Sequence, residues 1–284
     1  MMILRILGAV DPRVMAIVPG KVLRYKKIHF LTLLSLVVMD LLNARNNLHH
    51  HYQAYGGWSF AFNDYYEMNL TREIDSNEFA TLLNIVDPYE FREKLLMPKL
   101  VCTGAMDEFF VLDDSYYWWH QMPYADEMNR LIVVPNAEHS QITGFLELLP
   151  AFTTWARALL GANSKMEKLK QPLKSIEDRN LRSIRLMELA KIPKISWTVD
   201  EVNGDIIVQS DTKPKAVHVW HANSCALSAR RDFRIVNLDD PCLCGFKVPD
   251  EDLCANLAVL WSAEVSLKMS NEFQTAKKCT LLIR

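Results

Sequence analysis

The stretches PKLVCTGAMDEFF at residues 98–110 and LIVVPNAEHS at residues 131–140 decide the fold class. Each contains a short apolar run, Leu100–Thr103 in the first and Leu131–Val134 in the second. Short apolar runs bounded by turn residues are typical of buried strands in a parallel sheet. A third run, Val14–Val18, lies between two prolines. The first half of the chain is therefore expected to form a layered α/β structure.

Helical patterns lie between and after these strands. Residues Glu78–Ile85 form one, and Ile142–Leu160 form a longer one, with Gly161 as its expected C-cap. Residues 162–190 are rich in Lys, Arg and Glu, with apolar residues recurring every three to five positions, such as Leu181, Ile184 and Met187. This pattern predicts an amphipathic connector whose charges form a solvated helix face.

The hydrophobic period changes to two after Pro193. Ile195, Trp197 and Val199 alternate with polar residues, and the pair Asn203-Gly204 that follows is a typical hairpin turn. The same alternation returns at Val217 and Val219, and later at Leu257, Val259 and Trp261. Short alternating strands separated by turn residues predict a small β-sandwich.

Composition narrows the possible partners. Half of the 284 residues are apolar, 23% are charged, and the formal net charge is −2. This balance fits a globular protein with a core and gives no reason to expect nucleic acid as a partner. The 9 glycines include neither GxGxxG nor GxxxxGK[ST], so no nucleotide cofactor is expected. The apolar run Ile28–Met39 is shorter than the roughly 20 residues of a membrane-spanning helix, so no stable span is expected.

The cysteines gather near the C-terminus. Four of the six lie close together, at Cys225, Cys242, Cys244 and Cys254. This cluster favours disulfides formed in an oxidising compartment over a metal site, with buried free thiols as a third alternative. The sequon Asn69-Leu70-Thr71 would be usable in a secreted chain.

Two loops carry the candidate catalytic residues. Asp107 follows the strand Leu100–Thr103, and His139 follows the strand Leu131–Val134. The carboxyl ends of parallel strands meet at one edge of a sheet, where α/β enzymes place their catalytic loops. An aspartate there can accept the Nδ1 proton of a histidine and stabilise its imidazolium form. Taken singly, Asp107 is expected to be a turn or helix-capping residue, and His139 a surface or hydrogen-bonded core histidine. Their order and spacing together favour a catalytic pair.

A nucleophile is not evident. The sequence has no GxSxG motif, and the nearest match is Ser59 in Gly57–Ala61. A nucleophile elbow needs a buried strand before the serine, whereas polar and aromatic residues precede Ser59, so we do not expect Ser59 to attack a substrate. The triplet His49-His50-His51 is a poor metal site because adjacent side chains point in different directions, and local hydrogen bonds are expected there. Cys102 lies within a strand and is expected to be packed.

Several blocks of the sequence together resemble the PhoPQ-activated pathogenicity-related family, which includes the autocrine proliferation repressors. The blocks are Ala9–Val14, His50–Ser59, Ile85–Tyr89, Met97–Leu100, Gly104–Phe110, Val134–Ser140, Ile195–Trp197, Arg230–Arg234, Cys242–Cys244 and Leu260–Ser262. The resemblance implies an α/β-hydrolase domain followed by a small immunoglobulin-like β-sandwich, usually in a secreted protein. It also implies that Asp107 is the acid and His139 the base of a serine hydrolase triad.

The family's serine lies in a Gly-x-Ser-Lys-Arg-Gly-type elbow shortly before the block that resembles Ala9–Val14. The resemblance therefore implies that this chain is a C-terminal part with only the late strands of the sheet, and that it is inactive by itself. Residues 20–36 have no counterpart in the family and are either a retained intron, since Gly20-Lys21 can be encoded by GGUAAG, or a true insertion.

These expectations divide the chain into a partial α/β-hydrolase domain at 1–162, a helical connector at 163–191 and a β-sandwich domain at 192–284. The expected function is acyl hydrolysis of an ester or peptide by the parent protein. The alternative is a non-enzymatic secreted signal that binds a cell-surface receptor. Neither hypothesis calls for a metal or a cofactor.

Overall fold

The computed structural model describes residues 42–167, 176–200, 202–203 and 205–222, and then the short pieces 235–237, 246–247, 249, 253–255, 260–265, 274–277 and 280–283. The expected strand Val14–Val18, the apolar run Ile28–Met39 and the segment 20–36 lie outside these residues. So do the side chains of the C-terminal cysteine cluster. What was expected of them stays a prediction.

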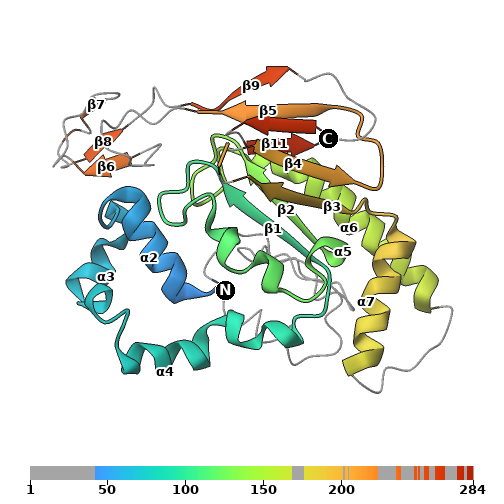
Figure 1. Ribbon diagram of the computed structural model, residues 1–284, viewed down its shortest axis with the longest axis horizontal. Helices are drawn as coiled ribbons and strands as arrows, with labels where there is room; N and C mark the ends of the chain where they lie inside the picture. The colour runs from blue at the N-terminus through green and yellow to red at the C-terminus, as the bar shows by residue number, and fades with distance from the viewer. Residues whose placement is uncertain are drawn as a thin grey trace.

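The described helices and strands follow one another along the chain (Figure 1). The α-helices are α2 (Ala44–Tyr55), α3 (Asn63–Glu67), α4 (Asn77–Val86), α5 (Ala125–Met128), α6 (Phe145–Glu167) and α7 (Ile176–Ala190). The strands are β1 (Lys99–Gly104), β2 (Asn129–Val134), β3 (Ile195–Val199), β4 (Asp205–Ser210), β5 (Val217–His221), β6 (Ile235–Asn237), β7 (Phe246–Lys247), β8 (Leu253–Ala255), β9 (Ser262–Val265), β10 (Gln274–Lys277) and β11 (Thr280–Ile283). This mixture of helices and strands confirms the α/β class.

A parallel pair of strands forms the centre of the first half. Strands β1 and β2 pair in parallel, with Leu100 opposite Arg130 and Gly104 opposite Val134. All six residues of β1 are buried, as the apolar run predicted. The parallel register brings the ends of both strands to the same edge, so the loops that follow Gly104 and Val134 emerge side by side (Figure 1).

Alternate side chains of β1 enter two different cores. Leu100 and Cys102 pack with α6 and α7, in a cluster that includes Phe152, Trp155 and Leu186. Val101 points into the other core, whose buried residues also include Leu42, Leu95, Met97, Trp118, Trp119, Met122 and Ala125. Because a strand alternates its side chains between two faces, covering both faces buries the whole strand. Trp118 and Trp119 are buried in the second of these cores.

The helices are found where they were predicted, but the helix expected at Ile142–Leu160 differs at both ends, since α6 begins at Phe145. The expected helix Glu78–Ile85 is confirmed as α4, which begins after Ser76, whose side chain accepts a hydrogen bond from the N–H of Phe79. The expected C-cap at Gly161 is wrong, because α6 continues through it to Glu167. The helix continues because Leu159 and Ala162, on either side of the glycine, pack in the core.

The expected connector contains a packed helix. α7 lies against α6, and it buries Leu186 and Met187 in the core shared with β1. Leu181, expected on the apolar face, is 62% exposed instead. The boundary expected at residue 162 falls within α6.

The described residues of the last third of the chain include antiparallel strands. They form three three-stranded sheets, in the orders β10-β4-β3, β11-β5-β9 and β6-β8-β7. Strands β3 and β4 pair across Asn203, as the hairpin signal predicted. Figure 1 shows β5, β9 and β11 above the β1–β2 pair, whereas β6, β7 and β8 are drawn apart from them at the upper left. Leu257 and Val259 lie outside the described residues.

Two glycines provide a test of the packing. A Cβ on Gly104 would lie 2.4 Å from the Ala137 carbonyl oxygen, whereas a Cβ on Gly161 would meet nothing within 4 Å. We expect Gly104→Ala to lower the free energy of unfolding by about 1–3 kcal/mol, because backbone must shift. The matched variant Gly161→Ala should raise it by up to about 1 kcal/mol, because alanine is the better helix former. Urea unfolding of the full chain measures both, and equal midpoints would contradict the close approach of the two loops.

Candidate active site

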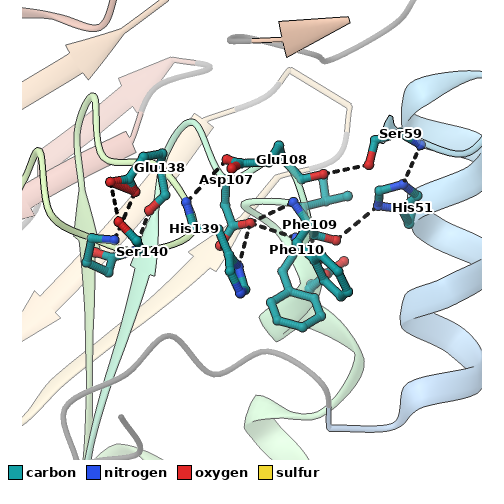
Figure 2. A network of polar contacts seen from close by, with 12 residues as sticks. His51, Ser59, Asp107, Glu108, Phe109, Phe110, Glu138, His139 and Ser140 are labelled. Carbon is teal, nitrogen blue, oxygen red and sulfur yellow. Dashed lines mark hydrogen bonds and ion pairs between the residues drawn. The ribbon is translucent and has the colours of Figure 1, made fainter. Parts of the chain in front are cut away.

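The first loop holds a buried aspartate. Asp107 lies three residues past Gly104, and its side chain has no exposed surface. Its Oδ1 accepts hydrogen bonds from the backbone N–H groups of Phe109, at 2.7 Å, and Phe110, at 2.9 Å (Figure 2). Aspartate makes such bonds to its own following turn readily. The turn therefore fixes the carboxylate without using all of its acceptor capacity.

The second loop brings His139 to that carboxylate. The imidazole Nδ1 lies 3.1 Å from each carboxylate oxygen of Asp107. The backbone N–H of His139 donates to Glu108 Oε2 at 3.3 Å. The ring also contacts two aromatic rings, with centroid distances of 5.1 Å to Phe109 and 5.3 Å to Phe110. The structure thus brings together the two residues that the sequence singled out.

The environment of His139 favours its protonated form. Burial by itself lowers the pKa of His139, but the hydrogen bond and the negative charge of Asp107 raise it, as do the charges of Glu108 and Glu138. The net result is a pKa above the ordinary value of 6.5. A carboxylate facing Nδ1 holds the proton on that nitrogen, so Nε2 of the neutral ring is the free base. In the described part of the chain, no hydrogen bond occupies Nε2, and the side chain is 38% exposed.

Glu138 shapes the turn that carries His139. Its buried carboxylate accepts hydrogen bonds from the N–H groups of Gln141, at 2.9 Å, and Ile142, at 3.1 Å. The hydroxyl of Ser140 also donates to it. Gln141 has a positive φ of 60°, so the chain reverses direction directly after the histidine. The sequence analysis missed Glu138, although an acidic residue beside a loop histidine was the available signal.

Ser59 and the residues around it form hydrogen bonds to other loops of the protein. Ser59 is buried, and its Oγ donates to the carbonyl oxygen of Glu108 at 2.7 Å. In Figure 2 it lies beyond the acid loop, on the side of α2. The histidine triplet diverges as expected. His49 contacts Asp75, His50 contacts Asp113, and His51 Nδ1 lies 3.1 Å from the carbonyl oxygen of Phe109. Each histidine thus has its own hydrogen-bond partner, but the bonds are not local as expected, because the partners lie 26, 63 and 58 positions away in the sequence.

A C-terminal tryptophan joins both loops. The side chain of Asn136, in the histidine loop, pairs with the backbone of Trp261, since Oδ1 accepts from its N–H at 2.7 Å and Nδ2 donates to its carbonyl at 3.0 Å. The indole N–H of Trp261 is 3.3 Å from the carbonyl oxygen of Ala105, in the acid loop. Trp261 is buried with Ala105 and Met106. Through Trp261 the last third of the chain thus contacts both the acid loop and the histidine loop.

A metal site, a reactive thiol and a membrane-spanning helix are each absent from the described residues. Among the described residues, no group of three or more His, Cys, Asp or Glu side chains could hold a metal ion. Cys102 is a free thiol whose burial raises its pKa to about 12, so it has little thiolate character. The helices within the described ranges include none that is long and apolar enough to cross a membrane.

The burial of the neutral His51 imidazole predicts that the protein loses stability in mild acid. Burial lowers its pKa from 6.5 to about 3, so only the unfolded chain takes up this proton between those values. Stability is therefore fully present above pH 6.5 and falls with pH below it, by up to about 1.4 kcal/mol per pH unit. His139, whose pKa is raised, adds stability that is fully present below pH 6.5 and is lost as the pH rises through its folded pKa, so it does not change the slope below pH 6.5.

Urea unfolding between pH 7 and pH 4.5 measures this contribution. We expect the wild-type chain and His49→Asn, which changes a surface histidine of the same helix, to lose stability in parallel. His51→Asn should start lower at pH 7 and show a flatter pH dependence. Identical slopes in all three chains would contradict a neutral, buried His51.

Known proteins agree with the resemblance seen in the sequence. The sequence model of the family described as PhoPQ-activated pathogenicity-related protein matches residues 6–182. Autocrine proliferation repressor protein A of Dictyostelium discoideum is 32% identical over 237 residues, which cover 84% of this chain and 40% of that protein. The chain thus spans about two fifths of the length of this relative. No solved structure matches significantly. The family match covers more than half of the sequence, and the chain therefore belongs to the PhoPQ-activated pathogenicity-related protein family.

Proposed function

We propose that this chain supplies the acid and the base of a serine hydrolase triad, in a parent protein that cleaves an ester or a peptide bond. The observation that carries the proposal is the contact of His139 Nδ1 with both oxygens of the buried Asp107 carboxylate, 3.1 Å from each. The two residues lie in loops that follow adjacent parallel strands, where α/β-hydrolases place their acid and histidine.

In this proposal each atom of the pair has a role. His139 Nε2 takes the proton from a serine hydroxyl as the serine oxygen attacks the acyl carbon. Asp107 holds the other ring nitrogen and stabilises the imidazolium that forms. Nε2 then gives the proton to the leaving alcohol or amine, and the same steps with water release the acid. The raised pKa of His139 supports this role, because it reflects a stabilised imidazolium.

The attacking serine is proposed to lie outside residues 1–284. The sequence contains no GxSxG, and the hydroxyls of Ser59 and Ser140 are donated to Glu108 and Glu138. On this proposal the chain by itself has no turnover. The parent has a complete α/β-hydrolase sheet followed by an immunoglobulin-like sandwich, and it is secreted. The exposed position of Asn69, in its sequon, supports the secreted location.

Transcript sequencing and active-site labelling test this proposal. We expect native transcripts to encode a strand, a GxSxG-type turn and a helix upstream of Met1, and to lack codons 20–36. The longer product should hydrolyse p-nitrophenyl esters and react with a fluorophosphonate, whereas residues 1–284 should do neither.

In the longer product, His139→Ala and Asp107→Asn should each lower kcat by a factor on the order of 10⁴. Asp113→Asn, which changes a partly exposed acid hydrogen-bonded to His50, is the matched control and should retain activity. Hydrolysis that survives in His139→Ala, or a fluorophosphonate adduct on a serine within 1–284, would rule out the proposed roles.

A second candidate is a secreted signal that acts without catalysis. It is favoured by the relative of Dictyostelium discoideum, whose name describes an autocrine proliferation repressor. The partner would then be a cell-surface receptor. Repression of cell proliferation that is undiminished in the His139→Ala protein supports this function, and its loss together with hydrolysis supports the enzyme.

A further inference from the structure

One short segment contacts three consecutive carbonyl groups of the acid loop. Tyr55 Oη donates to the carbonyl oxygen of Asp107 at 2.8 Å, and Ser59 Oγ to that of Glu108 at 2.7 Å. His51 Nδ1 contacts the carbonyl oxygen of Phe109 at 3.1 Å. We infer that His51, Tyr55 and Ser59, here called the acid-loop clamp, are positioning residues that aim the Asp107 carboxylate at His139. This inference rests on the proposed function of the pair.

The clamp is set by local sequence. His51 and Tyr55 are four residues apart on α2, so their side chains lie on one face of the helix. Gly56, with a φ of 68°, ends the helix in the left-handed conformation and turns the chain back. The turn places the N–H of Ser59 3.2 Å from His51 Nε2. Since Nε2 accepts this bond, the proton of the neutral ring is on Nδ1, which donates to Phe109 (Figure 2).

Peptide planarity carries the effect to the carboxylate. In a trans peptide group, the C=O of one residue and the N–H of the next point in opposite directions. Ser59 holds the carbonyl of Glu108, and the N–H of that same peptide group, from Phe109, donates to Asp107 Oδ1 at 2.7 Å. His51 holds the carbonyl of Phe109, and the matching N–H, from Phe110, donates to Oδ1 at 2.9 Å. Two peptide groups are thus fixed at one end by the clamp and at the other by the aspartate.

The clamp is shielded from solvent and from the reacting atoms. His51, Tyr55 and Ser59 are 1%, 5% and 7% exposed. The hydrogen bonds described above join them to the acid loop and join Ser59 to His51, and none of these bonds reaches His139. Rings of Trp58 and Phe62 cover His51, with centroid distances of 5.7 and 4.3 Å. The clamp therefore acts on His139 through the acid loop, and chiefly through the Asp107 carboxylate.

The test reads the pKa of His139 by NMR, in the full chain with ¹⁵N-labelled histidine. Ser59→Ala and Tyr55→Phe each remove one clamp bond. We expect each to move the His139 titration midpoint down by about half a pH unit, because a less well oriented carboxylate stabilises the imidazolium less. Ser59→Thr, which keeps the hydroxyl, should restore the wild-type midpoint.

Two variants serve as matched controls. Ser164→Ala removes another serine-to-carbonyl bond, to Leu160 within α6, and Tyr52→Phe removes a hydroxyl from a half-exposed tyrosine of α2. Both should leave the His139 midpoint unchanged. Tyr55→Phe removes a single oxygen and keeps the ring, so it decides the question if Ser59→Ala does not fold. An unchanged midpoint in folded Tyr55→Phe overturns the inference.

This readout is separate from catalysis. It needs no nucleophile and no turnover, so the clamp can be confirmed in residues 1–284 even if the longer product proves not to be a hydrolase. Conversely, a hydrolase in which Tyr55→Phe leaves the pKa of His139 unchanged would keep the proposed function and reject the clamp.

Discussion

A carboxylate without exposed surface is the constraint on which the rest of this structure depends. An isolated buried charge is strongly unfavourable, and it is tolerated only where hydrogen bonds and an opposite charge compensate it. Asp107 receives two backbone N–H groups from its own turn and the imidazole of His139. The compensating groups come from different segments, so the position of the aspartate depends on packing across the first half of the chain.

Three regions distant in sequence meet at this point. Helix α2 and the turn after it hold the acid loop through backbone carbonyls. The parallel register of β1 and β2 sets the two loops side by side. Trp261 then ties both loops to the last third of the chain, through Asn136 and the carbonyl of Ala105. The C-terminal part of the chain therefore helps to support the site through Trp261. A substitution of Trp261 is expected to alter the pKa of His139.

The sequence predicted the parts of this site that follow simple periodicity. Two apolar runs, each followed by a turn with a polar residue, were enough to place Asp107 and His139 together. The clamp was not predictable in this way, because its contacts are side chain to backbone across about 50 positions, and such bonds leave no periodic signal. The His51–Ser59 segment instead appeared as a weak metal motif and a weak nucleophile motif.

Other differences have a similar cause. Gly161 has the local signature of a helix end, but the packing of Leu159 and Ala162 continues α6 beyond it. Leu181 has the spacing of a buried residue, yet it is exposed, because α7 presents Leu186 and Met187 to the core instead. Tertiary contacts override local preference in both cases. Trp261 shows the same limit, since its contact with two loops leaves no signal in the sequence.

The most direct test of the account is the titration of the His139 imidazole, followed by ¹⁵N NMR in the wild-type chain and in Asp107→Asn. The account predicts a midpoint above 6.5 in the wild type, with the neutral ring protonated on Nδ1. It predicts a lower midpoint in the variant, where the hydrogen bond and the charge of the aspartate no longer oppose the effect of burial. A wild-type midpoint at or below 6.5 that does not respond to Asp107→Asn would contradict the claim that these two residues form an acid–base pair.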